Sequence, residues 1–148
     1  MTLNAGELAD DLHGIGPQDT IADAAGAWAS AVGAYAAGVV PTSTTIAAAT
    51  AGLQTALAGA FAQAESEDAI ADIEDAFAAF ATTVATGMLG AGFTGAAPTG
   101  EVGFADLFDG PTDDAEAAAF AIASAIHTWM VTGTATLNAP PGTVSPWA

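Results

Sequence analysis

The sequence predicts a mainly α-helical protein: an antiparallel bundle of four to five helices with a glycine-rich ordered loop and a C-terminal β-strand and extended tail. Over most of the 148 residues, large apolar side chains recur at alternating steps of three and four, the rhythm of helices packed lengthwise. Glycine and proline break this rhythm in residues 87–111. From residue 131 the alternation changes to a period of two, which indicates a strand.

The first two helices are expected before residue 41. The first covers residues 3–13 and places Leu8 and Leu12 on one face. Asp19 or Thr20 can cap the second, because either side chain can accept a hydrogen bond from the first helical turn. The apolar seam of this second helix consists of Ile21, Ala25, Trp28, Val32, Tyr35 and Val39. A narrow stripe of small residues on it allows close approach of another helix, in the same chain or in a second subunit: Gly26, Ser30, Gly33 and Ala37.

The third and fourth helices repeat the same rhythm. Pro41 ends the second helix, and Thr42 or Ser43 can start the third. The fourth opens at "ESEDA", where Ser66 can cap and the following acids lie where the helix dipole favours anions. The third seam consists of Ile46, Thr50, Leu53, Leu57 and Phe61, and the fourth of Ile70, Ile73, Phe77, Phe80 and Val84.

Residues 87–111 are expected to form an ordered excursion that lies on the bundle, or a contact loop, because their apolar side chains are too many for a solvated linker. A last helix begins at "TDDAE", where Asp113 and Glu116 have capping-box spacing. It continues through Ala119, Ile122, Ile126 and Trp129. Aromatic residues at helical spacing are expected in the core: Trp28, Tyr35, Phe61, Phe77, Phe80, Phe120 and Trp129.

The chain therefore divides into a helical bundle domain, residues 1–130, and an extended C-terminal strand and proline-rich tail, residues 131–148. The strand at 131–137 has no obvious second strand in its own chain, so we expect it to add to a partner's sheet or to pair between copies. Trp147 either folds back or anchors on another chain. The residues expected to bind a partner are Val131, Thr132, Thr134, Thr136, Leu137, Pro140, Pro141 and Trp147.

The charge balance limits the classes of partner. The chain has 17 acidic residues and no lysine or arginine. Nucleic-acid binding depends on neutralising phosphates with cationic side chains, so we expect no nucleic-acid partner. The same absence argues against anionic membrane surfaces and phosphate-ester substrates. The fold must depend on apolar packing and hydrogen bonds, with the net charge serving solubility.

We expect neither a secretory signal nor a transmembrane segment. The N-terminal residues lack a basic start and an apolar run. Residues 24–64 carry no charge, but they are rich in alanine and glycine, which favour membrane insertion only weakly. We interpret this stretch as a buried helical hairpin. With no cysteine and only two histidines, neither a disulfide nor a three-histidine zinc centre can form within the chain.

No residue pattern predicts catalysis or a cofactor. Acid pairs occur at several helix starts, where the dipole alone explains them. His13 and His127 each lie near the end of a helix, and a favourable interaction with the dipole accounts for both. The best metal candidate is a calcium-binding loop with the ligands Asp106, Asp109, Asp113 and Asp114, although its spacing does not fit an EF-hand. A loop that leads into a capped helix explains the same residues.

Several stretches resemble known proteins. "DAAGAWASAVGAYAAG", "AAAFAIASAIHTWMVTGTATL" and "APPGTVSP" resemble the small accessory structural proteins, rich in alanine, glycine and threonine, that are found among the capsid and tail genes of tailed bacteriophages. The resemblance implies a non-enzymatic virion component, made in the bacterial cytoplasm, that assembles with itself and with other virion proteins. "GVVPTSTTIAAATAGLQTALAGAFAQ" also resembles the helical hairpin of the PE proteins of mycobacteria.

We therefore expect a structural assembly protein of the capsid, neck or tail that docks through its C-terminal strand and tail. Two alternatives remain. One is a helical bundle that binds a small ligand or a cation through residues 87–111, and the other is a secreted partner protein like the PE proteins.

Overall fold

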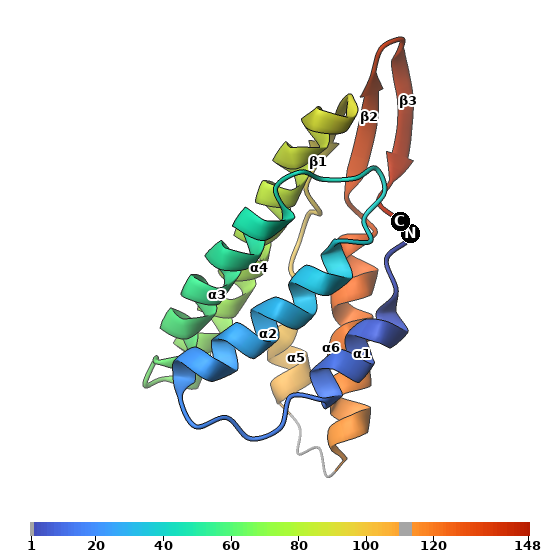
Figure 1. Cartoon of the computed structure of the whole chain (residues 1–148). Helices are drawn as coiled ribbons and strands as arrows, with labels where there is room; N and C mark the ends of the chain where they lie inside the picture. Colours follow the sequence, from blue (N-terminus) through green and yellow to red (C-terminus); the bar gives the residue numbers. More distant parts are fainter. Residues whose placement is uncertain (1, 110–113) are drawn as a thin grey trace.

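The computed structural model describes residues 2–109 and 114–148, and it confirms a helical bundle with a small antiparallel sheet (Figure 1). The helices are α1 (Ala5–His13), α2 (Ile21–Ala36), α3 (Ile46–Phe61), α4 (Ser66–Gly87), α5 (Phe104–Phe108) and α6 (Ala115–Met130), with a 3-10 turn η1 (Met88–Ala91) after α4. The strands are β1 (Phe93–Ala96), β2 (Thr134–Asn138) and β3 (Pro141–Pro146). They form one sheet in the order β1-β2-β3.

The long helices bury the apolar seams that the sequence predicts. α3 packs between α2 and α4, while α1 packs against α6 (Figure 1). The largest fully buried side chains on the helices are Leu8, Val32, Leu53, Leu57, Phe77, Phe80, Val84, Phe104, Ile126 and Met130. Two residues that the sequence predicts to be buried are exposed: Ile21 at the start of α2 is 47% exposed, and Phe120 on α6 is 61% exposed. Phe120 follows Ala119 and is therefore turned about 100° away from the buried face of the helix.

The structure confirms one of the predicted helix caps and differs at others. Thr20 caps α2 as predicted, because its side chain accepts a hydrogen bond from the backbone of Asp23. The prediction for α4 is wrong, since Glu65 occupies the cap position there and Ser66 is already helical. Asp114 caps α6 through the backbone N–H groups of Glu116 and Ala117. The predicted capping residue Asp113 lies outside the described residues.

The hydroxyl groups between α2 and α3 stabilise a different helix from the one expected. α3 begins at Ile46 without a side-chain cap. Ser43 instead donates to the carbonyl of Val84 at 2.7 Å, and Thr44 donates to the carbonyl of Gly87 at 3.1 Å. These carbonyls belong to the last turn of α4, where intrahelical donors run out. A Cβ atom at Gly87 would lie 2.2 Å from the Ser43 hydroxyl, so only glycine fits this contact.

The charge-free residues 24–64 form the α2–α3 hairpin. In this hairpin the small residues serve packing within the chain. A Cβ atom at Gly33 would lie 2.3 Å from the Thr50 hydroxyl, and one at Gly26 would lie 3.2 Å from the Gln54 amide. Ser30 and Ala37, the other members of the predicted stripe, are exposed. Among the described residues, no helix is both long and apolar enough to cross a membrane.

The glycine-rich loop lies on the bundle, as predicted, and a single carboxylate fixes it. The Glu74 side chain on α4 accepts hydrogen bonds from the backbone N–H groups of Val102, Gly103 and Phe104, at 2.7 to 2.8 Å. Gly103 has a φ of +94°, a left-handed conformation that turns these groups toward one point. The arrangement holds the start of α5 and places the fully buried Phe104 ring against Phe77, with centroids 5.0 Å apart.

This contact predicts a stability effect of Glu74→Gln. The amide keeps one acceptor oxygen but turns an NH₂ group toward backbone donors, so we expect the free energy of unfolding to fall by about 1–3 kcal/mol. Urea denaturation followed by circular dichroism measures it. Asp75→Asn is the matched control, because it removes the same charge from an exposed neighbour. Equal stability of the two variants would contradict a role for Glu74 in holding the loop.

Candidate functional site

The C-terminal tail is built into the core of its own chain. Trp147 is 1% exposed, and its indole N–H donates to the carbonyl of Thr134 at 3.1 Å. Its ring lies directly on Gly133, where a Cβ atom would come within 2.6 Å of the ring carbons. The tryptophan therefore needs a glycine beneath it, fourteen positions earlier in the sequence.

Backbone hydrogen bonds complete this attachment. The N–H of Trp147 donates to the carbonyl of Gly133 at 2.9 Å. Val40, in the connection between α2 and α3, exchanges two hydrogen bonds with Ala148: its N–H donates at 2.9 Å, and its carbonyl accepts at 3.4 Å. The tail is thus fixed to both the end of α6 and the α2–α3 connection.

These contacts correct two expectations about the tail. Of the alternatives for Trp147, the structure shows that it folds back. The expectation that the strand at 131–137 lacks a partner in its own chain is wrong, because β2 pairs antiparallel with β1 on one side and β3 on the other. The sequence missed β1 because it is only four residues long and contains a glycine. The β2–β3 hairpin and the residues after it also share one hydrophobic core with residues 1–130, through Ala135 and Trp147.

The predicted partner-binding residues are therefore not one exposed surface. Trp147 is buried, whereas Thr132 and Pro140 are exposed. The half-buried members of the set are Val131, Thr134, Thr136 and Leu137. The side chain of Pro141 lies outside the part of the chain that the structure describes.

What remains free is the far side of the β2–β3 hairpin. The hairpin extends past the ends of the helices (Figure 1). β3 is an edge strand of the sheet, with its second side unpaired among the described residues. Val144 on β3 is 60% exposed, although its register partner Thr136 is half-buried. An exposed apolar side chain on an unpaired edge is a feature of strand-addition surfaces.

His127 lies in the last turn of α6, as predicted, and its ring also contacts α2. Its Nδ1 atom lies 2.9 Å from the hydroxyl of Tyr35 on α2, and the two rings meet edge to face. Tyr35 is 5% exposed, and this burial raises the pKa of its hydroxyl above the ordinary value of about 10. The pair ties α2 to α6.

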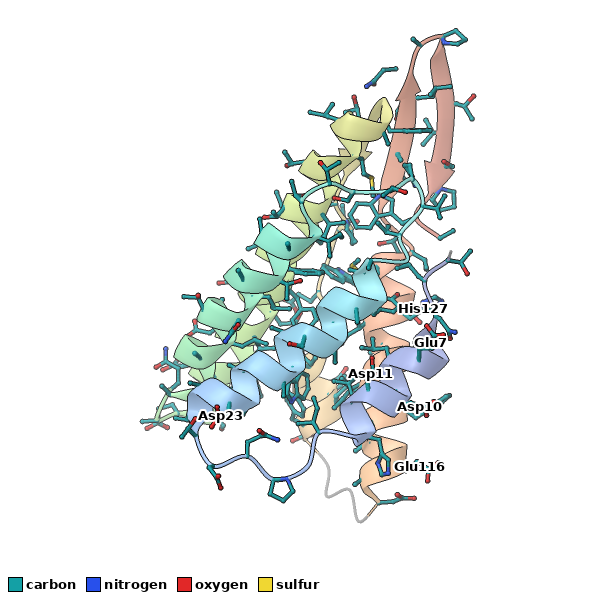
Figure 2. The ribbon with its side chains drawn as sticks, in the orientation of Figure 1. Glu7, Asp10, Asp11, Asp23, Glu116 and His127 are labelled. Atoms are coloured by element: carbon teal, nitrogen blue, oxygen red, sulfur yellow. The ribbon has the colours of Figure 1, made fainter. Side chains whose placement is uncertain are left out.

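Several acidic residues lie on α1 and at the start of α6. Figure 2 shows Glu7, Asp10 and Asp11 along α1, and Glu116 at the start of α6. A groove of about 540 Å³ lies between the two helices. Its lining residues are Gly6, Ala9, Asp10, His13, Asp114, Glu116, Ala117 and Phe120.

The calcium prediction finds no support in the described residues. They contain no group of three histidine, aspartate or glutamate side chains placed to hold a metal ion. Asp106 lies in the first turn of α5, Asp109 follows that helix, and Asp114 caps α6. Asp113, the fourth predicted ligand, lies outside the described residues.

Comparison with known proteins gives no family: no family model, curated protein or solved structure matches the chain.

The burial of Trp147 predicts a large effect of Trp147→Ala. Removing the ring leaves a cavity over Gly133, so the free energy of unfolding should fall by about 3–5 kcal/mol. Val144→Ala, on the exposed side of the same hairpin, should change it by less than about 0.5 kcal/mol. Chemical denaturation measures both, and a Trp147→Ala variant as stable as the control would show that the tail does not dock.

The burial of Tyr35 predicts that the free energy of unfolding falls at alkaline pH. Tyr35 is the one tyrosine in a chain without lysine, arginine or cysteine, so no other side chain titrates above about pH 8. Above about pH 10 the unfolded chain loses the tyrosine proton while the folded chain keeps it, so stability falls as the pH rises.

The Tyr35→Phe variant should lack this fall, although it loses the hydrogen bond to His127 at every pH. Urea unfolding of both proteins between pH 8 and pH 11 provides the comparison. Parallel curves for the two proteins would contradict the assignment.

Proposed function

We propose that the protein is a non-enzymatic structural assembly protein that joins neighbouring proteins through its C-terminal hairpin. The observation that carries this proposal is the way in which the β2–β3 hairpin is attached to the helical bundle. The base of the hairpin is fixed to the bundle by Trp147 and Ala148, while its outer strand β3 extends beyond the helices with an edge that no other described strand pairs with. A rigid base with a free edge suits a fixed contact between subunits.

The chemistry of β3 supports strand addition as the mode of contact. An incoming strand can hydrogen-bond to the edge backbone, while Val144 supplies an apolar contact. Pro141 and Pro146, at the two ends of β3, lack an N–H donor. They limit the edge to a short segment, which favours a defined contact over open-ended aggregation.

The proposed setting is a virion of a tailed bacteriophage, in the capsid, neck or tail. Support comes from the resemblance of "AAAFAIASAIHTWMVTGTATL" and "APPGTVSP" to accessory virion proteins, two stretches that contain α6 and the hairpin. The partner on β3 is then a second copy or a neighbouring virion protein.

Val144→Asp tests the proposal. The substitution leaves the core untouched but places a charge in the proposed contact, so affinity for the partner should fall at least about tenfold. Size-exclusion chromatography with light scattering measures assembly of the chain alone and together with the proteins encoded beside it. A point variant is preferable to deleting residues 131–148, because the deletion would also remove Trp147 from the core.

Ile21→Asp is the matched control. Ile21 is also an exposed apolar residue, at the first position of α2, where a carboxylate is favourable. The control should assemble like the parent chain, and circular dichroism should show the same helicity in all three proteins. Undiminished assembly of Val144→Asp, or a parent chain that assembles with nothing, contradicts the proposal.

A further inference from the structure

The groove between α1 and α6 combines an exposed aromatic ring with carboxylates. Phe120 is the most exposed of the large apolar side chains on the helices, at 61%. Asp10 on α1 and Glu116 on α6 line the same groove, and both side chains are exposed. His13 and Asp114 also line it, and the small side chains of Gly6, Ala9 and Ala117 leave room for a ligand of the size of one or two amino-acid side chains.

The carboxylates differ in what they already bind. Asp114 is engaged as the cap of α6, where it accepts two backbone hydrogen bonds. In the part of the chain that the structure describes, no hydrogen bond joins the side chain of Asp10 or Glu116 to another residue. Both carboxylates line the groove that Phe120 also lines.

A positively charged group fits this arrangement. Carboxylates attract a cation, and the face of an aromatic ring attracts it as well, within about 6 Å of the ring centroid. The guanidinium of arginine satisfies both, because its planar fork pairs with carboxylates and its face stacks on a ring. The aliphatic part of the side chain can lie on the small residues of the groove.

The composition determines where this cation comes from. The chain contains no lysine or arginine, so a second copy offers no such side chain either. We infer that the groove binds an arginine- or lysine-bearing segment of a different protein, with the cation over Phe120 and between Asp10 and Glu116. This contact is independent of the hairpin edge, since the groove lies at the start of α6 and the hairpin follows its end.

The probe is an acetylated and amidated hexa-arginine peptide. Any strongly acidic protein attracts such a peptide weakly, so binding is measured by isothermal titration calorimetry at about 0.15 M ionic strength, where charges beyond about 8 Å are largely screened. The parent chain should bind, and the double variant Asp10→Asn/Glu116→Gln should bind at least about tenfold more weakly.

The control double variant is Glu67→Gln/Asp68→Asn. It removes the same two charges from exposed positions at the start of α4, outside the groove, and should weaken binding less than about twofold. Equal weakening in the two double variants would show a general attraction to a polyanion and would overturn the inference. Absence of binding by the parent chain would overturn it as well.

Phe120 provides a readout without a change of charge. Phe120→Leu keeps an apolar side chain but removes the ring face, so binding should weaken about threefold or more, whereas Phe120→Tyr should bind like the parent chain. Equal affinity of the leucine variant would contradict the cation–ring contact. Val144→Asp should leave peptide binding unchanged, so that failure of the hairpin proposal and failure of this one are distinguishable.

Discussion

The constraint on which the structure depends is the absence of any lysine or arginine beside seventeen carboxylates. Without these partners, the acidic side chains that stabilise the fold bind backbone N–H groups. Glu74 holds the start of α5 in this way, and Asp114 caps α6. Hydroxyl groups satisfy the opposite kind of backbone group, as Ser43 and Thr44 do for the carbonyls of α4. All four of these side chains stabilise helix ends.

The absence of cationic side chains also makes close packing of the helices and strands important. With mutual repulsion among the carboxylates opposing compactness, the bundle depends on tight apolar packing. Glycines provide it at specific contacts: Gly33 against Thr50, Gly87 against Ser43, and Gly133 under the ring of Trp147. Each pair is far apart in the sequence, so these glycines fix the tertiary arrangement and not the local conformation. The hairpin can be held rigidly because the last of these contacts anchors its base.

A feature can be predicted from the sequence when the residues that form it are close together along the chain. Apolar spacing is a local signal, and it located the long helices and the glycine-rich loop. The role of Glu74 cannot be predicted in this way, because nothing local shows that its oxygens meet N–H groups of residues 102–104. β1 and the docking of Trp147 depend on contacts between distant segments and were missed or left open. Phe120 is a different kind of error: it lies on a helix, as its spacing predicts, but on the exposed face of that helix.

The tail is anchored within the chain by Trp147 and Ala148, and we propose that the outer edge of β3 is free for another protein. Hydrogen exchange followed by NMR tests both statements, because it reports each amide separately. In the monomer, the backbone and indole N–H groups of Trp147 should exchange as slowly as amides in the core of α4. Outward-facing amides of β3 should exchange rapidly and become protected only in the assembled state. Rapid exchange at Trp147 would contradict the first statement, and a β3 edge unchanged by assembly would contradict the second.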